Sequence, residues 1–254
     1  MKAMILAAGV GSRLRPLTDT LPKALIDING VPVLEIVLRR LINAGCTAVV
    51  INVFHFAEMI EDFLRAKGNF GIHLEISRES ELLDTGGGLK KVAGFFDDGQ
   101  PFFLHNVDVI SNIDLNKMYR FHVEKAALAT LAVQARTTGR YFLFDDNGML
   151  CGWESVTANR QQWARKPMGR VERLAFNGIH VIAPAIFDKM SETGVFSINE
   201  TYLRLAGAGE KILAFRTEEY YWRDIGRPEK LEQVRQEINR LQIAEFSVLE
   251  QSIR

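Results

Sequence analysis

The chain has 254 residues, of which 47% are hydrophobic and 24% are charged, with 31 Lys and Arg balanced by 31 Asp and Glu. This composition is typical of a folded globular protein and excludes a disordered chain, a collagen-like repeat and a disulfide-rich scaffold. A formal net charge of zero gives no sign of a broad basic surface for nucleic acid, although it is compatible with a local cationic site. No stretch approaches the ~18 apolar residues of a membrane-spanning helix, so we expect no membrane segment.

The two cysteines, Cys46 and Cys151, lie in apolar stretches and form no CxxC pair. We therefore expect buried free thiols, which are typical of a reducing compartment. The apolar run at the N-terminus stops at Gly9, which is too early for a secretory signal peptide. These features predict a cytoplasmic protein. The sequence leaves a monomer and a homodimer equally open.

The first half of the chain alternates apolar strands with amphipathic helices. Helices are predicted around residues 33–42, 56–64 and 115–121, and Gly45 fits the end of the first. Strands are predicted at Lys2–Ala8, Thr47–Val53, Ile72–Ser77 and Pro101–His105. Such alternation is typical of a parallel sheet with helices on both faces, which binds ligands at the carboxyl edge of its strands.

The second half has a different pattern. Its strand-like segments cover residues 127–135, 141–145, 149–153 and 174–182, with a turn signal at Asp145–Gly148. Thr157–Arg170 is polar and basic and is interpreted as a flexible surface loop, while helices are expected at Asn199–Ala206 and Pro228–Leu241. The sequence therefore predicts a Rossmann-like, three-layer α/β/α fold. Its mixed, mostly parallel sheet would carry a small antiparallel extension.

A glycine-rich string follows the first strand: LAAGVGSRLRPLT, from Leu6 to Thr18, and then Pro22-Lys23. Small residues let a backbone approach a ligand closely, and their N–H groups can hold phosphate oxygens. Arg13 and Lys23 would supply the cations that a polyphosphate needs. The string is not the dinucleotide fingerprint, because Leu14 stands where that motif has glycine, and it lacks the GK[ST] of a Walker loop.

This string resembles the signature of the sugar-1-phosphate nucleotidyltransferases, also called nucleotide-sugar pyrophosphorylases, and the similarity extends over nearly the whole chain. The resemblance implies Mg²⁺-dependent transfer of a nucleoside monophosphate from an NTP to a sugar 1-phosphate, with release of pyrophosphate. In that family the residue matched by Arg13 contacts the leaving pyrophosphate, and the one matched by Lys23 contacts phosphates at the reaction centre. The loop residues that the resemblance implies for nucleotide binding are Leu6, Ala7, Ala8, Gly9, Gly11, Ser12 and Arg13.

A second glycine-rich segment, ESELLDTGGG, runs from Glu79 to Gly88. Its three glycines predict a backbone that lies flat against a base and reads its polar edge, although a simple glycine hinge is an alternative. The resemblance implies base contacts from Glu79, Thr85, Gly86 and Gly87. The segment is most similar to short N-acetylmuramate-1-phosphate uridylyltransferases and to heptose- and mannose-1-phosphate guanylyltransferases.

Two aspartates are candidate metal ligands. Asp108 follows a predicted buried strand, in Asn106-Val107-Asp108, where the family usually has Gly-Asp. Asp224 lies in WRDIGRPE, which resembles the family segment W-x-D-I/V-G-T/R-P-E. The resemblance implies that Asp108 and Asp224 hold Mg²⁺, for which carboxylates are suitable ligands, and that Trp222 lies near the sugar. Read alone, each aspartate could instead cap a local turn or helix.

The segment Phe176-Asn177-Gly178-Ile179 resembles a family strand that lines the sugar pocket. It implies sugar contacts from Asn177 and Gly178, with Glu172 and Gly139 as further candidates and Arg140 beside Gly139 at the border of the pocket. The family's Glu-Lys pair would correspond to Glu172-Arg173. Tyr220, Tyr221 and Trp222 could form a cation–π cage for phosphocholine, the acceptor of cytidylyltransferase relatives.

The expected organisation is one nucleotidyltransferase domain over residues 1–254, without a β-helix domain. It would comprise a nucleotide-binding part at about 1–125, a sugar-binding part at about 126–227 and a C-terminal helix at about 228–254. The first hypothesis is uridylyl transfer to an N-acetylmuramate-like sugar 1-phosphate, a cell-envelope role. Guanylyl transfer to mannose- or heptose-1-phosphate, cytidylyl transfer to phosphocholine and a non-catalytic nucleotide-sugar-binding regulator remain alternatives. No nucleic-acid partner is expected.

Overall fold

The computed structural model describes residues 1–241, with side chains up to residue 238, so the last part of the C-terminal helix expected at about 228–254 lies outside the described residues. Residue contacts divide the chain into two compact units, each built from separate stretches of sequence. Unit 1 contains Met1–Met4, Leu83–His105 and Asp114–Glu219, and unit 2 contains Ile5–Leu82, Asn106–Ile113 and Tyr220–Arg254. Strands β1 (Lys2–Leu6) and β6 (Phe102–Asn106) contribute residues to both.

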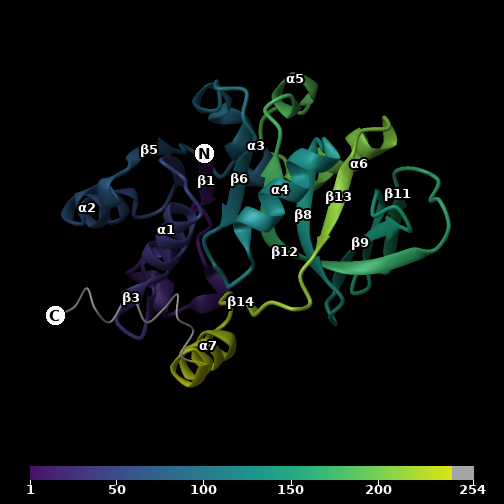
Figure 1. Ribbon diagram of the computed structural model, residues 1–254. Helices are drawn as coiled ribbons and strands as arrows, with labels where there is room; N and C mark the ends of the chain where they lie inside the picture. Colours follow the sequence, from purple (N-terminus) through teal and green to yellow (C-terminus); the bar gives the residue numbers. More distant parts are fainter. Residues whose placement is uncertain (242–254) are drawn as a thin grey trace. The chain divides into compact units, whose positions relative to one another are not determined.

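Unit 2 combines a parallel strand pair with three α-helices (Figure 1). Strand β4 pairs in parallel with β5, β7 pairs with β14, and β2 pairs with β3. The strands after β1 are β2 (Asp27–Ile28), β3 (Val31–Pro32), β4 (Ala48–Val53), β5 (His73–Arg78), β7 (Val109–Ser111) and β14 (Trp222–Asp224). The helices are α1 (Val33–Asn43), α2 (Ala57–Ala66) and α7 (Pro228–Leu241).

Helix α1 shows how the local sequence fixes this unit. Leu34, Leu38 and Leu41 recur at helical spacing and are fully buried. The helix ends where Gly45 adopts φ +94°, a left-handed conformation that favours glycine, and the Cys46 N–H donates to the Leu41 carbonyl at 2.9 Å. The predicted end of the helix at Gly45 is confirmed.

Unit 1 is built around the long strand β12 (Val171–Ile182), whose first residues pair with β9 and whose later residues pair with β8 and β6. Strands β11, β10, β9 and β12 follow one another in antiparallel order, while β8 and β13 form a parallel pair. The other strands are β8 (Ala129–Gln134), β9 (Arg140–Asp145), β10 (Leu150–Ser155), β11 (Arg160–Trp163) and β13 (Ile212–Arg216). The helices are α3 (Asp84–Lys91), α4 (Leu115–Lys125), α5 (Ile186–Lys189) and α6 (Ile198–Gly207).

These elements confirm the expected mixed α/β class with an antiparallel extension, and the described residues contain no β-helix. Cys46 and Cys151 are buried and free, as predicted. Burial raises the pKa of the Cys46 thiol to about 12 and that of Cys151 to about 11, which keeps both protonated and unreactive. Within residues 1–241, no helix combines the length and the apolar character that crossing a bilayer requires.

Two local predictions were wrong. Thr157–Arg170 is not a loop throughout, because Arg160–Trp163 forms β11 and pairs with β10 in the register Gly152↔Trp163 to Ser155↔Arg160. All four residues of β11 are exposed, so an edge strand formed here without the apolar alternation that would reveal it. The second error concerns residues 86–88, which do not form a flat, extended surface but lie inside helix α3.

Candidate active site

The phosphate-loop candidate in unit 2 is a tight, internally bonded turn. Ser12–Leu14 forms a 3₁₀ turn, the Leu14 N–H donates to the Gly11 carbonyl at 2.8 Å, and the Thr18 hydroxyl donates to the same carbonyl at 2.9 Å. Gly11 has φ +64°, and a Cβ there would lie 2.8 Å from Thr18 Cγ2. Both observations require glycine at this position. Ala7 and Ala8 are buried below the turn, whereas Gly9 is exposed.

A buried polar chain links this loop to Glu79. The Ala7 N–H donates to Asn52 Oδ1 at 2.8 Å, and Asn52 Nδ2 donates to Glu79 Oε1 at 2.8 Å. The Glu79 N–H donates to the Val53 carbonyl at 2.8 Å, which fixes Glu79 directly after β5. Asn52 and Glu79 are 3% and 7% exposed, so the chain is shielded from water and holds the Glu79 carboxylate in one position.

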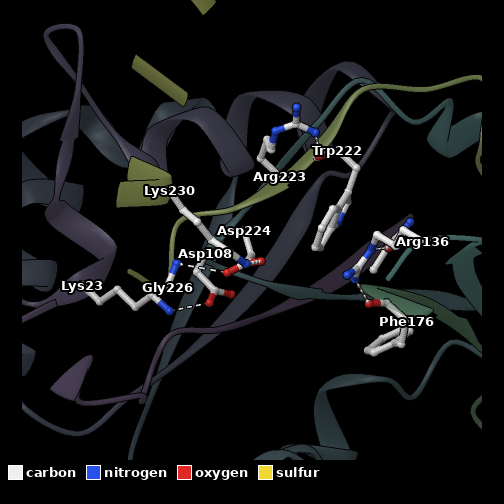
Figure 2. A network of polar contacts seen from close by, with 10 residues as sticks. Lys23, Asp108, Arg136, Phe176, Trp222, Arg223, Asp224, Gly226 and Lys230 are labelled. Atoms are coloured by element: carbon white, nitrogen blue, oxygen red, sulfur yellow. Dashed lines mark hydrogen bonds and ion pairs between the residues drawn. The ribbon is translucent and has the colours of Figure 1, made fainter. Parts of the chain in front are cut away.

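Asp108 lies in the turn between β6 and β7 and accepts a charged hydrogen bond from Lys23 (Figure 2). The side chains of Lys23 and Asp108 are 12% and 21% exposed. Val107, which replaces the small residue of the family motif, is buried, and its N–H donates to the Leu6 carbonyl at 3.1 Å. This larger residue therefore packs inward while the carboxylate of Asp108 stays accessible.

Asp224 is brought beside Asp108 by the pairing of β14 with β7. Asp224 is opposite Val109 in that antiparallel pair, and the Ile225 N–H donates to the Asp108 carbonyl at 3.0 Å. The sequence could not show this proximity, because more than a hundred positions separate the two aspartates. Asp224 forms an ion pair with Lys230 in the first turn of α7, and the Gly226 N–H donates to Asp224 Oδ1 at 3.3 Å (Figure 2).

Arg13 reaches the same place from the glycine-rich loop. An added Cβ on Gly226 would lie 3.2 Å from Arg13 Nη2 and 3.2 Å from Asp224 Oδ1. The guanidinium of Arg13 and the carboxylate of Asp224 therefore both border Gly226. Within unit 2 the structure thus brings together Arg13, Lys23, Asp108 and Asp224, the four residues that the sequence singled out for chemistry.

The donor set suits a hard divalent cation. Asp108 and Asp224 present carboxylate oxygens side by side, each already facing an ammonium group. Among the described residues no cluster of three or more His, Cys, Asp or Glu side chains forms a metal cage. Two carboxylates with room for water and phosphate oxygens are the arrangement that Mg²⁺ prefers beside nucleotides.

Tyr221, just before β14, and Trp222, its first residue, do not form an open cage. Trp222 is 8% exposed, and its carbonyl accepts a bond of 2.9 Å from Arg223. The Tyr221 ring faces the Arg223 guanidinium at 5.3 Å, and its hydroxyl donates to Glu237 at 2.8 Å. Since Tyr221 already binds a cation of the protein, this geometry disfavours a choline pocket.

The threonine and glycines of the second motif lie in unit 1, in the first turn of α3. Thr85 Oγ1 accepts the Ile198 N–H at 3.0 Å, and the N–H groups of Gly86 and Gly87 donate to the Phe196 carbonyl at 2.9 and 3.2 Å. A Cβ on Gly86 would lie 2.4 Å from the Phe196 ring. These glycines are therefore explained by close packing of α3 against the segment before α6.

Asn177 is fully buried in β12 and its amide is engaged on both sides. Its Oδ1 accepts from Arg136 Nε at 3.3 Å, and its Nδ2 donates to Thr217 Oγ1 at 2.8 Å. Arg136 also donates to the Phe176 carbonyl at 2.9 Å (Figure 2). Asn177 thus supports the strand from inside, and the neighbouring Gly178 is buried as well.

The other two sugar-site candidates have local partners in unit 1. The Gly139 carbonyl accepts the Val156 N–H at 2.9 Å, at the end of the β9–β10 pair. Glu172 forms an ion pair with Arg216 and lines a hollow of about 450 Å³ that includes neither Asn177 nor Gly178. The structure therefore does not bring Glu172 together with the other sugar-site candidates.

Sequence reasoning missed Asn52 and Lys230. Asn52 is a polar residue within the apolar run Val49–Val53. A polar residue in a buried strand needs a hydrogen-bond partner, so this position could have been recognised from the sequence. Lys230 had no comparable signal, because its approach to Asp224 depends on the turn between β14 and α7.

The comparisons with known proteins agree with this geometry. A family model described as nucleotidyl transferase matches residues 2–240, so the chain belongs to the nucleotidyl transferase family. It is 30% identical to mannose-1-phosphate guanyltransferase beta-A of Xenopus laevis over 90% of the chain and 62% of that protein. It is 31% identical to UTP–glucose-1-phosphate uridylyltransferase of a Synechocystis strain over 89% of the chain and 60% of that protein. The chain therefore spans less than two thirds of the length of these relatives.

A solved structure supports the fold. The structure assigned as a glucose-1-phosphate thymidylyltransferase from Bacillus anthracis superimposes with a TM-score of 0.76 at 18% identity, covering 92% of this chain and 94% of that one. At this identity the likeness establishes the architecture alone.

Proposed function

We propose that the protein is a sugar-1-phosphate nucleotidyltransferase, which converts an NTP and a sugar 1-phosphate into an NDP-sugar and pyrophosphate. The observation that carries this proposal is the pair of adjacent carboxylates, Asp108 and Asp224, each in contact with a lysine and bordered by Arg13. The arrangement combines ligands for a divalent cation with cations for a polyphosphate. The activities named for the relatives, guanylyl and uridylyl transfer to sugar 1-phosphates, are of this kind.

In the proposed reaction a phosphate oxygen of the sugar 1-phosphate attacks the α-phosphorus, and the bond from that phosphorus to the pyrophosphate oxygen breaks. A phosphomonoester with a second pKa near 6 is mostly dianionic at neutral pH, so no general base is needed. This agrees with the absence of a histidine or serine nucleophile among the residues brought together here. When bound by Asp108 and Asp224, Mg²⁺ would supply positive charge between the phosphates.

The protein's own cations would align and neutralise the phosphates. Lys23, next to Asp108, would contact a phosphate at the reaction centre. Arg13, beside Gly226, would bind the departing pyrophosphate through its planar set of donors. The loop around Gly11, held by Thr18, would place backbone N–H groups against the triphosphate.

For the substrates we propose UTP or GTP as donor and a hexose-type 1-phosphate as acceptor, since the named relatives transfer uridylyl and guanylyl groups. An N-acetylmuramate-like 1-phosphate remains the first candidate from the sequence, with mannose- and heptose-1-phosphate next. A choline acceptor is disfavoured by the Tyr221–Arg223 contact. A cytoplasmic location and a monomeric or homodimeric state remain predictions.

The test is pyrophosphate release with Mg²⁺, crossing UTP, GTP, CTP and dTTP against N-acetylmuramate-, glucose-, mannose- and heptose-1-phosphate and phosphocholine. The proposal would be supported by one NTP and acceptor pair that gives rapid pyrophosphate release only when both substrates are present. The variant Asp108→Asn should fail to turn over that pair. Nucleotide-sugar binding by the folded protein without turnover of any pair would favour the regulator instead.

A further inference from the structure

Unit 1 contains a cavity of about 900 Å³ that belongs to none of the sites described above. Residues of β9, β10 and β11 line one side of it, and residues of α6 and of the segment before α6 line the other. Among the residues expected at the sugar pocket, Arg140 lines this cavity, whereas Gly139, Glu172, Asn177 and Gly178 do not. Its size is within the range of small-molecule sites.

Strand register places two arginines side by side on this wall. Ser155 of β10 is opposite Arg140 of β9 on one side and Arg160 of β11 on the other. Directly opposed residues of antiparallel strands share a face, so both guanidinium groups border the same part of the cavity, about 10 Å apart at their backbones. Neither arginine forms an ion pair with a described residue.

The charge of the cavity favours an anion. The third arginine, Arg204, is occupied by Glu192 through bonds of 2.8 and 2.9 Å. Glu200 is the one lining carboxylate, among the described residues, without such a cation partner. Two unneutralised guanidinium groups against one carboxylate leave a local positive excess, which a phosphate or carboxylate would satisfy.

An aromatic surface lies beside the arginines. Trp153 is opposite Gln162 and two residues from Ser155, so it lies on the same face about 7 Å along the strand. Trp163 also lines the cavity and is 48% exposed, but it is opposite Gly152, so the strand alternation puts it on the other face from Trp153. Indole faces stack on the apolar face of a sugar ring, and Gln162 and Asn199 offer amide groups to its hydroxyls.

We propose that this cavity, lined by Arg140, Trp153, Arg160 and Trp163, is a second binding site that takes a sugar phosphate. The ring lies against Trp153 while the phosphate lies between the two arginines. The inference rests on unit 1 alone and does not depend on the reaction proposed above.

The test uses quenching of tryptophan fluorescence, because two of the three tryptophans of the chain line the cavity. The probes are glucose 6-phosphate, mannose 6-phosphate and N-acetylglucosamine 6-phosphate, whose phosphate is not at the anomeric carbon. Glucose, inorganic phosphate and UMP are titrated in parallel. We expect saturable quenching by at least one sugar phosphate, and at least tenfold weaker binding of glucose and inorganic phosphate.

The variants locate the binding. The double variant Arg140→Gln, Arg160→Gln should weaken the binding of the sugar phosphate at least tenfold, and Trp153→Phe should reduce the quenching amplitude. Trp222→Phe, in unit 2, and Lys23→Ala, at the candidate active site, should leave the affinity unchanged. The proposal is overturned by absence of saturable quenching with all three sugar phosphates, by loss of binding in Lys23→Ala, or by binding of UMP alone.

Discussion

Replacing Lys230 by methionine should tighten the binding of a divalent cation at Asp224. In the structure the Lys230 ammonium contacts the carboxylate that a metal would need, so the metal must displace it. The side chains of Lys230 and Asp224 are 44% and 24% exposed, and a partly exposed pair of this kind is worth about 0.2–1 kcal/mol. Because 1.4 kcal/mol corresponds to a factor of ten, we expect the affinity to rise about 1.4- to fivefold.

The measurement is a titration with Mn²⁺ followed by electron paramagnetic resonance of the free ion, which is independent of turnover. Lys230→Arg, which keeps the charge, should stay near the wild-type affinity. Lys117→Met is the matched control, because it removes an exposed ion pair with Glu219 in unit 1. An affinity that is unchanged or weaker in Lys230→Met, or an equal gain in Lys117→Met, would refute the reasoning.

Four further predictions follow from the geometry. Asp108→Asn should lower kcat about a hundredfold or more in the pyrophosphate-release assay, since a preorganised charge is lost; a rate near wild type would remove Asp108 from the mechanism. Lys23→Ala should cost a similar factor with an unchanged circular dichroism spectrum, and retained activity would contradict its phosphate role. Gly11→Ala should destabilise the protein by about 1–3 kcal/mol, because Gly11 has a positive φ and Thr18 lies too close to an added Cβ. Gly9→Ala is the control, because the space around Gly9 is open, and it should leave the stability unchanged. Equal thermal unfolding midpoints for the two variants would contradict this. Burial lowers the pKa of the His122 imidazole to about 4, against about 6.5 in the unfolded chain. The contribution of His122 to the free energy of unfolding, up to about 3 kcal/mol, is therefore present above pH 6.5 and is lost as the pH falls towards 4. A His122→Gln variant should lose that part of the pH dependence in urea unfolding, and a curve parallel to wild type would count against it.

Local signals in the sequence predicted local structure well. The apolar spacing of α1 and the glycine after it fixed the helix and its end, because both depend on neighbours within a few residues. The edge strand β11 was missed because its pairing depends on β10, and its exposed polar residues carry no alternation. The glycines of α3 were misinterpreted for a related reason: the space they leave is filled by Phe196, more than a hundred positions away.

The candidate site shows the same division. The glycine-rich loop is a continuous segment, so its phosphate-binding character was readable from the residues themselves. The approach of Asp108 to Asp224 was available only through resemblance to a family, because it arises from the β7–β14 pairing. Lys230 was available from neither source, since it depends on how α7 begins after β14 in this chain.

The ion pairs of the site also explain how two carboxylates can lie so close before any ligand arrives. Asp108 and Asp224 would repel each other at this separation, but Lys23 and Lys230 neutralise them in place, and Arg13 adds one further positive charge. When a divalent cation binds the two carboxylates, the ammonium groups of Lys23 and Lys230 lose their partners. Both ammonium groups then lie beside the position where phosphates would bind. The lysines can then transfer from carboxylate to phosphate with small movements, so the charges that stabilise the carboxylate pair become those that the proposed reaction requires. On this reasoning Lys230 should matter twice, as a competitor of the metal and as a phosphate contact, and Lys230→Met should bind Mn²⁺ more tightly while binding the nucleotide more weakly.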